Sequence, residues 1–261
     1  MKYLIVGGDS NTDQYFDSIS NPNMDFNYPK WPELLGDKLD MKVINVARSG
    51  QGNEYIYTTL RNEIIKIEDK SEIGLVLATW TQAPRRDFKN EISTNHQPWS
   101  SLRFDTHGNL PFWVERTLGH MLNFQILCER YDVPYAHFQM IEMYEHFLAG
   151  HWPSQNDIHY GADPRVRATY PGDEKKDKKV IFNMFIEYEA KLDTSKFMGW
   201  PPVKELGGWR FKDQLDIWKI KESPRRVSEL DNHPNALGHV AMCDKINMLL
   251  QEYNIIGKNN G

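Results

Sequence analysis

The sequence predicts an α/β fold in which a parallel β-sheet is covered by helices on both faces. Short apolar runs typical of buried parallel strands alternate along the chain with longer segments of helical spacing. Such alternation favours right-handed crossovers and places functional loops at the carboxyl ends of the strands. A chain of 261 residues, 40% of them hydrophobic, is long enough to bury one sizeable core as a single domain.

Each predicted strand is a short run rich in apolar and β-branched residues. The first ends at the pair Gly7-Gly8, and the second ends in a turn of small residues, Ala47–Gly52. Because a turn follows each run, the residues just beyond it are expected at one edge of the sheet. The predicted strands are Lys2–Val6, Lys42–Val46, Ile73–Ala78 and Pro134–Ile141.

Each predicted helix carries apolar residues at helical spacing. Pro32 stands at an early position that helices tolerate, and Asn53 is predicted to cap its helix, with Glu54 in the first turn. The predicted helices are Trp31–Leu39, Asn53 to about Ile67, Phe112–Arg130 and about Asn235–Tyr253.

Two stretches lack this rhythm. Residues 85–110 are polar and aromatic without a clear period. Residues 146–228 contain several prolines and tryptophans and one helical segment near Val180–Leu192. They also contain the charged run Asp173–Lys179, which we interpret as a solvated loop. Both stretches are predicted to be insertions over the carboxyl edge of the sheet, where loops build substrate sites.

Charge and composition argue against several classes of partner. The net charge is −5 and the pI is about 6.0, which gives no electrostatic footprint for nucleic acid or an anionic membrane. No apolar run approaches bilayer-spanning length, and the first residues lack the features of a signal peptide. Cys128 and Cys243 lie in predicted helices, as is typical of reduced core thiols. We therefore expect a cytoplasmic protein, although release by lysis or packaging in a virion would leave no mark in the sequence.

Ser10 lies in the turn that follows the first predicted strand. A serine there can project its hydroxyl above the sheet, and backbone N–H groups of the turn can receive developing negative charge. A helix N-cap and a dinucleotide-binding turn are the alternatives. The latter needs Gly-x-Gly-x-x-Gly, whereas this turn reads Gly-Gly-Asp-Ser. By itself, this turn leaves Ser10 as either a candidate nucleophile or a capping residue.

The last predicted turn supplies a candidate base. Asp231 stands two positions before His233, so its carboxylate can orient the imidazole by accepting the Nδ1 proton. Pro234 stiffens the exit from the turn, and Asn235 can cap the helix that follows. Ser10 and this turn both fall where an α/β sheet places its active site. Together they predict a Ser-His-Asp triad.

Three segments, in order, resemble sequence blocks of the SGNH (GDSL-type) hydrolases. Gly8–Asn11 is similar to the first block, Asn45–Gly50 to the second and Asp231–His233 to the fifth. The resemblance implies a flavodoxin-like three-layer α/β/α fold with Ser10 as the nucleophile. It also implies an oxyanion hole built from the N–H groups of Ser10 and Gly50. It covers the two ends of the chain and residues 45–82, and leaves the insertions unmatched.

The sequence departs from this family at two places. The third block usually supplies an asparagine that completes the oxyanion hole, whereas the strand here runs into Thr-Trp-Thr-Gln. Thr81, Gln82 or Asn53 could donate instead, and loss of one such donor costs about 10² to 10³ in rate. The usual position of the fifth-block acid is held by Leu230. The shorter Asp-x-His spacing also occurs in acyltransferase-like relatives.

Candidate substrate-binding residues follow the third predicted strand. Trp80, Arg85 and Arg86 are expected near the cleft, where the arginines could hold a substrate carboxylate or sulfate, or could equally be solvated charges. Tryptophans of the insertions could stack on sugar rings or pack within a lid. The histidines and the two cysteines lack the usual metal-ligand spacings, so neither a metal nor another cofactor is predicted.

The turns and the resemblance together predict a metal-independent serine esterase. Its expected substrates are short acyl esters, with O-acetyl groups on a carbohydrate as the favoured case. An O-acyltransferase that uses the same triad is the alternative among enzymes. A non-catalytic glycan-binding or virion-associated protein that keeps the fold is the alternative outside them. The expected partner is a small-molecule or glycan ester, with no nucleic acid and no membrane, and the oligomeric state is left open.

Overall fold

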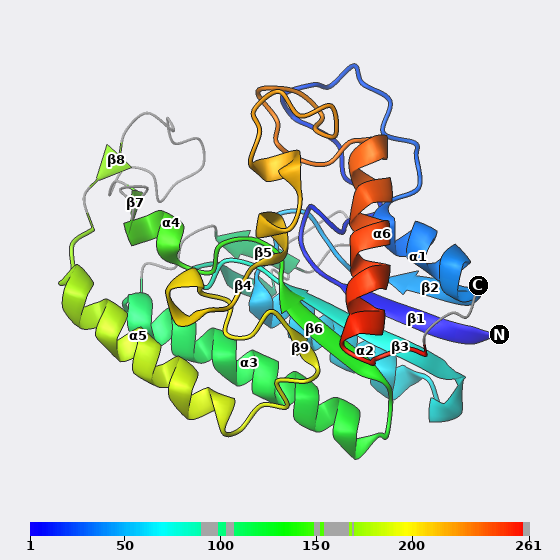
Figure 1. The fold of residues 1–261 in the computed structure, drawn as a ribbon, viewed down its shortest axis with the longest axis horizontal. Helices are drawn as coiled ribbons and strands as arrows, with labels where there is room; N and C mark the ends of the chain where they lie inside the picture. The colour runs from blue at the N-terminus through cyan, green and yellow to red at the C-terminus, as the bar shows by residue number, and fades with distance from the viewer. Residues whose placement is uncertain (90–98, 103–106, 149–151, 154–166, 169, 258–261) are drawn as a thin grey trace.

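The computed structural model has one sheet of five parallel strands at its centre (Figure 1). It describes residues 1–89, 99–102, 107–148, 152–153, 167–168 and 170–257. The parallel sheet confirms the predicted α/β class. In sheet order, the strands are β2 (Met41–Asn45), β1 (Lys2–Gly7), β3 (Ile73–Trp80), β6 (Tyr135–Gln139) and β9 (Phe197–Met198).

Helices cover both faces of the sheet and complete a three-layer arrangement (Figure 1). One face is covered by α1 (Trp31–Leu39) and α6 (Ala236–Glu252). The other is covered by α2 (Asn53–Lys66), α3 (Leu110–Arg130) and α5 (Glu174–Glu189). Successive side chains of a strand point to opposite faces. Leu4 and Val6 therefore belong to the hydrophobic core on the side of α1 and α6, whereas Ile5 belongs to the core on the side of α2 and α3.

The direction of winding reverses between β1 and β3. The chain builds β2 on one side of β1 and then crosses to the other side to build β3. Open α/β sheets bind ligands outside the carboxyl ends of the strands at such a switch point. The turn that begins at Gly8 and the segment that begins at Thr81 meet there, because β1 and β3 are parallel neighbours and Gly7, the last residue of β1, pairs with Ala78 near the end of β3.

The four strands and the four helices predicted outside the two irregular stretches are present, with ends shifted by at most two residues. The helical segment predicted near Val180–Leu192 is α5, which begins six residues earlier, at Glu174. The predicted cap of α2 is wrong. Asn53 is the first residue of α2 and not its cap, which is Gly52. The Asn53 side chain instead hydrogen-bonds the backbone of Thr81 beyond the neighbouring strand. Asn109 provides a side-chain cap for α3, since its Oδ1 accepts the N–H of Phe112 at 3.0 Å.

The prediction that residues 146–228 form an insertion is wrong in part. This stretch supplies α5 and β9, which belong to the central layers. The charged run Asp173–Lys179 is not a loop, because Asp173 caps α5 and the run forms its first turns. These charged residues lie on the first turns of an amphipathic helix. Because all seven residues of the run are charged, its sequence shows no apolar positions at helical spacing. β9 has two residues, too few for a period to be recognised.

Two antiparallel strand pairs lie outside the main sheet. They are β4 (Arg86–Lys89) with β5 (Trp99–Leu102), and β7 (Trp152–Pro153) with β8 (Arg167–Ala168). Asp87 of β4 accepts hydrogen bonds from the backbone N–H groups of Gly52 and Tyr55 at 2.7 and 2.8 Å and so connects the first pair to the start of α2. The remaining short elements are α4 (Glu145–Leu148) and 3-10 turns at Lys70–Glu72, Lys204–Leu206, Phe211–Asp213 and Asp216–Trp218.

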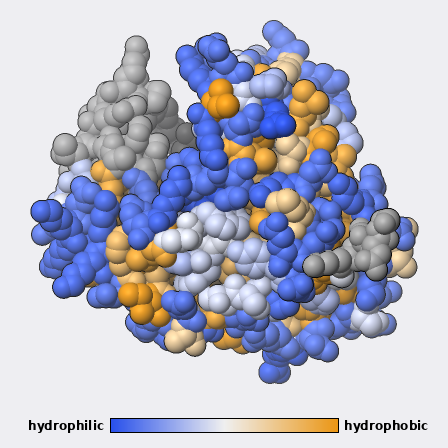
Figure 2. Space-filling view, viewed as in Figure 1, coloured by the Kyte–Doolittle hydropathy of each residue, from blue (hydrophilic) through white to orange (hydrophobic). Residues whose placement is uncertain are grey.

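Figure 2 shows hydrophilic side chains over most of the face seen in Figure 1, with hydrophobic side chains in separate patches. Within the described ranges, no helix combines the length and the apolar character needed to cross a bilayer. Even α3, 21 residues long, carries the charged pairs Glu115-Arg116 and Glu129-Arg130.

Candidate active site

The turn after β1 and the turn before α6 meet in space. Ser10 Oγ lies 2.8 Å from Nε2 of His233, and Nδ1 of His233 lies 2.6 Å from Oδ1 of Asp231. Ser10 and His233 are half-buried, whereas Asp231 is buried. The three predicted residues therefore form one hydrogen-bonded chain, although Ser10 and His233 are 223 positions apart in the sequence.

The Asp231 carboxylate is held by several donors. Oδ1 accepts the backbone N–H of His233 at 3.0 Å, and Oδ2 accepts the hydroxyl of Ser18, a buried side chain. Asn21 Nδ2 donates to Ser18 Oγ at 3.2 Å and to Ser228 Oγ at 3.0 Å. Burial disfavours the charged form, but the hydrogen bonds from His233 and Ser18 hold the pKa of Asp231 well below its usual range. Asp231 is therefore ionised at neutral pH.

The neighbouring positions do not offer a competing acid. Leu230 is 84% exposed and has no acceptor in its side chain. Glu229 points to solvent and pairs with the exposed Lys221 at 3.2 Å. Of the carboxylates near this turn, Asp231 is the one that contacts the imidazole.

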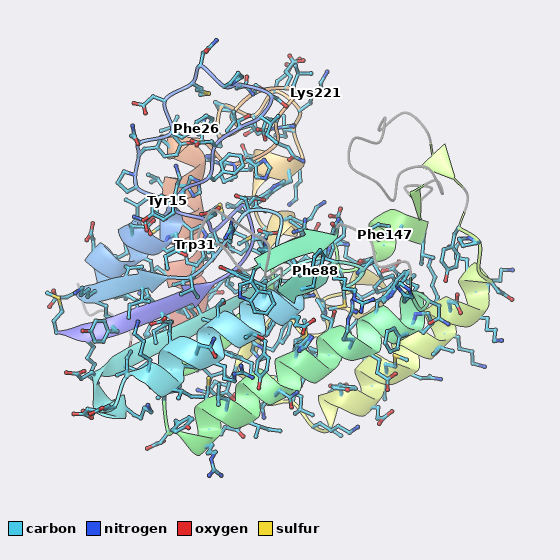
Figure 3. All side chains as sticks on the ribbon, turned by 180° about the vertical axis from the view of Figure 1, so that it is seen from behind. Tyr15, Phe26, Trp31, Phe88, Phe147 and Lys221 are labelled. Atoms are coloured by element: carbon cyan, nitrogen blue, oxygen red, sulfur yellow. The ribbon has the colours of Figure 1, made fainter. Side chains whose placement is uncertain are left out.

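The segment between β1 and α1 covers the imidazole. The Phe16 ring lies over His233, with ring centroids 4.2 Å apart and planes inclined by 33°. Phe16 belongs to a small cluster with Phe26 and Val227, which joins this segment to the loop before α6. Phe26 lies on the same segment, beyond the edge of the sheet (Figure 3). Sequence reasoning missed Phe16 and Ser18, because no motif or period connects them to a turn more than 200 positions away.

Asp9 fixes the turn that carries Ser10. Its Oδ1 accepts the backbone N–H of Asn11 at 3.0 Å, and its Oδ2 accepts the Thr81 hydroxyl at 2.8 Å. Arg85 Nη1 lies 3.7 Å from the same Oδ2. Ser10 is followed by further turns and not by a helix, so it is not a helix N-cap. These contacts anchor the turn to the segment after β3.

Two backbone N–H groups are available beside the Ser10 hydroxyl. Among the described residues, neither the N–H of Ser10 nor that of Gly50 has a hydrogen-bond partner. Gly50 has φ +79°, a left-handed conformation that costs other residues more than glycine. The Ser49 N–H and hydroxyl donate to Asp13 Oδ2 at 2.7 and 2.6 Å and hold this loop against the first turn.

The three candidates for a third oxyanion donor differ in the hydrogen bonds that they already make within the protein. Asn53 Nδ2 already donates to the carbonyl of Thr81 and to the hydroxyl of Thr117. The Thr81 hydroxyl donates to Asp9. Gln82 is half-buried, and its Oε1 accepts Nε of Arg85 at 3.3 Å, which leaves its amide N–H groups without a partner in the described parts of the chain.

The predicted substrate-binding residues lie in three different environments. The prediction for Trp80 is wrong: the side chain is fully buried and donates to His137 Nδ1 at 3.2 Å, so it belongs to the core. Arg85 is mostly buried and braces the loops, since its Nη1 donates to the carbonyl of Gln51 at 2.9 Å. Arg86 is exposed and lines a separate cavity of about 450 Å³.

The second histidine near the last turn is structural. His239 is buried in α6, and its Nδ1 accepts the backbone N–H of Trp31 at 3.2 Å. Burial, with the positive charge of Lys30, lowers the pKa of His239 to about 3. His239 is therefore neutral and ties α6 to α1.

Both cysteines are free thiols in the core, as predicted. Burial raises the pKa of Cys243 to about 11, so its thiol is protonated at neutral pH. In the parts of the chain that the structure describes, no group of three or more His, Cys, Asp or Glu side chains is arranged to hold a metal ion.

Comparison with protein-family models and with curated proteins finds no match. Solved structures with similarity over nearly the whole chain include the psychrotrophic esterase EstA from Pseudoalteromonas sp., at 12% identity and a TM-score of 0.48, covering 97% of this chain and 99% of the esterase. A GDSL-like lipase from Bacteroides thetaiotaomicron matches at 12% identity and 0.44, covering 96% of this chain and 88% of the lipase. The acetyl xylan esterase AlAXEase matches at 10% and 0.44, covering 94% and 98%. Because these identities and TM-scores are low, the similarity does not establish an activity for this chain.

Proposed function

We propose that this protein is a serine ester hydrolase with Ser10 as nucleophile, His233 as general base and Asp231 as the acid that orients the base. The observation that carries this is the continuous chain from Ser10 Oγ through His233 to a buried, ionised Asp231. Such a chain lets the imidazole take the serine proton while the carboxylate holds the required tautomer. A binding protein that merely kept the fold would have no need of this alignment.

In the first step, His233 Nε2 accepts the hydroxyl proton as Ser10 Oγ attacks the ester carbonyl carbon. The carbonyl π electrons move to oxygen, and the N–H groups of Ser10 and Gly50 donate to the resulting oxyanion. Collapse of the tetrahedral intermediate expels the alcohol, which takes the proton from Nε2. An acyl group remains on Ser10.

In the second step, water loses a proton to His233 Nε2 and attacks the acyl carbonyl carbon. A second oxyanion forms in the same hole, and its collapse breaks the bond to Ser10 Oγ, which takes the proton back from His233 Nε2 as the carboxylic acid is released. Replacement of the water by a sugar hydroxyl would make the same site an O-acyltransferase. The half-buried position of His233 leaves the site open to water, which favours hydrolysis.

A serine-reactive probe tests this function. A fluorophosphonate is expected to add once to the protein, and peptide mass spectrometry is expected to locate the adduct on Ser10, because only this serine is paired with an imidazole base in the described ranges. His233→Ala should abolish the labelling. Esterase activity without a Ser10 adduct would contradict the proposal.

The proposed substrates are short acyl esters, and O-acetyl groups on a carbohydrate are the favoured case. Support comes from the polar surroundings of the site: Asp13, Arg48 and Ser49 line the cavity of about 710 Å³ next to it. We expect p-nitrophenyl acetate to be hydrolysed with a higher kcat/KM than the octanoate. The reverse ranking would indicate an apolar acyl pocket, and transfer to an added sugar in preference to water would identify the acyltransferase.

Gln82 is proposed as the third oxyanion donor, since its amide N–H groups are the uncommitted ones among the three candidates. Gln82→Glu removes the donor but keeps the acceptor for Arg85, and is expected to lower kcat by about 10² to 10³ with little change in KM. Gln14→Glu, the same substitution at an exposed position after β1, is the matched control. A kcat within a few-fold of the unmodified protein would remove Gln82 from the hole.

A further inference from the structure

A cavity of about 710 Å³ is lined by residues of the segment after β1, which carries Ser10, and of the loop after β2, which carries Gly50. One wall contains Asp13, three residues after Ser10, and another contains Ser49, directly before Gly50. The two walls are joined by the hydrogen bonds from Ser49 to Asp13. The cavity therefore begins within a few residues of both Ser10 and Gly50, and its volume is within the range of about 300–1,000 Å³ that is usual for small-molecule sites.

The lining of the cavity is aromatic and polar. Trp99 of β5 and Tyr55 of α2 meet edge to face, with centroids 5.5 Å apart and planes at 89°, and both line the cavity. Tyr15, 81% exposed, lines it from the segment after β1 (Figure 3). Asn45 and Asn62 also line the cavity. The amide of Asn45 is engaged within the protein, since its Nδ2 donates to the carbonyl of Thr12 and to Glu33 and its Oδ1 accepts the N–H of Ala47. Aromatic rings that pack against apolar faces, interleaved with hydrogen-bonding side chains, suit a ligand that alternates C–H faces and hydroxyl groups.

The charges of the lining residues restrict the class of ligand further. Three carboxylates, those of Asp13, Asp17 and Glu63, line the cavity together with one guanidinium, that of Arg48. Lys66 lies 3.4 Å from Glu63, but it is an exposed side chain that does not line the cavity. The surplus of negative charge attracts cations, leaves neutral ligands unaffected and repels anions.

We propose that this cavity binds the alcohol part of the ester as a short oligosaccharide of neutral or amino-bearing pyranose residues. The inference rests on the proposed function for the position of the acyl group, but the binding itself does not depend on catalysis. Trp99 and Tyr15 contact the apolar faces of the rings, and Asn62 and Asp17 contact hydroxyl or ammonium groups. Uronic and sialic acids are disfavoured.

Binding is measured with the Ser10→Ala protein, so that no turnover interferes. The probes are four trisaccharides: xylotriose, cellotriose, the trimer of glucosamine and the trimer of galacturonic acid, titrated by isothermal calorimetry. At least one of the first three is expected to bind, and the galacturonate trimer is expected to bind at least tenfold more weakly than the best of them. Absence of binding by all neutral and cationic probes, or preference for galacturonate, would overturn the inference.

Variants locate the binding. Trp99→Ala and, separately, Tyr15→Ala are expected to raise Kd by about three- to tenfold, the effect of removing one aromatic contact. Phe88→Ala removes an exposed ring from β4, the partner strand of β5, without touching the cavity, and should leave Kd unchanged. Unchanged Kd in both Trp99→Ala and Tyr15→Ala would place the glycan elsewhere.

The results separate this inference from the proposed function. If a fluorophosphonate labels Ser10 but no trisaccharide binds, the hydrolase proposal stands and the cavity does not bind the glycan. If a trisaccharide binds through Trp99 and Tyr15 but Ser10 resists the probe and no ester is hydrolysed, the cavity is a glycan site on a non-catalytic protein.

Discussion

Ser10→Ala is expected to lower kcat for p-nitrophenyl acetate by about 10⁵ to 10⁶, the loss found when the nucleophile of a serine triad is removed. The hydroxyl is the atom that becomes acylated, and alanine offers His233 nothing to deprotonate. The measurement is steady-state turnover of the variant, with circular dichroism and thermal unfolding to verify that the fold is retained. A half-buried Oγ at the end of a turn contributes little to packing, so the Tm should change by only a few degrees.

Ser20→Ala is the matched control for this substitution. Ser20 is an exposed serine on the segment after β1, and its replacement should leave turnover within about twofold of the unmodified protein. A residual rate in Ser10→Ala within tenfold of the unmodified protein would exclude acylation of Ser10 as the principal route.

Asp231→Asn is expected to lower kcat by about 10⁴ while the protein stays folded. The amide N–H of asparagine can donate to Nδ1, a hydrogen bond that the carboxylate cannot make, and it then selects the tautomer that carries its proton on Nε2. In that tautomer Nε2 cannot accept the proton of the Ser10 hydroxyl, whose Oγ lies 2.8 Å away. Turnover measured across pH 5 to 9 should stay low throughout, because the wrong tautomer and not a shifted titration causes the loss.

Glu229→Gln tests the neighbouring carboxylate. Its side chain pairs with Lys221 at the surface, so the substitution should cost less than tenfold in kcat. If Glu229→Gln impaired turnover more than Asp231→Asn, the hydrogen bond between Asp231 and His233 would have no catalytic role and Asp231 would be a turn residue.

The alternation of apolar runs and helical segments was enough to predict the sheet and four of its covering helices. Burial on both faces demands continuous apolar strands such as Ile73–Ala78, and covering helices demand an apolar stripe, so both leave periodic marks in the sequence. The elements that were misread leave no such marks. β9 has two residues, and the start of α5 is a charged run whose exposed helical face resembles a solvated loop.

The turns that carry Ser10 and His233 could also be recognised from the sequence, because each follows or precedes a predicted element at the edge where α/β sheets bind ligands. Which side chains serve those turns could not. Asn53 and Thr81 look like free donors in the sequence, but the structure commits both of them to holding the neighbouring loops. Trp80 follows the same logic: it ends a strand near the site, yet its ring turns into the core.

The sequence by itself therefore determined the fold class, the places of the strands and the candidate chemistry of three turns, because local periodicity and turn residues encode these directly. Only the tertiary structure decided the partners. The contact of Ser18 with Asp231 spans 213 positions, and Phe16 reaches His233 from the other end of the chain. Contacts of this kind depend on how the loop after β1 folds over the carboxyl edge, and a loop's path is set by packing between distant segments that no local pattern records.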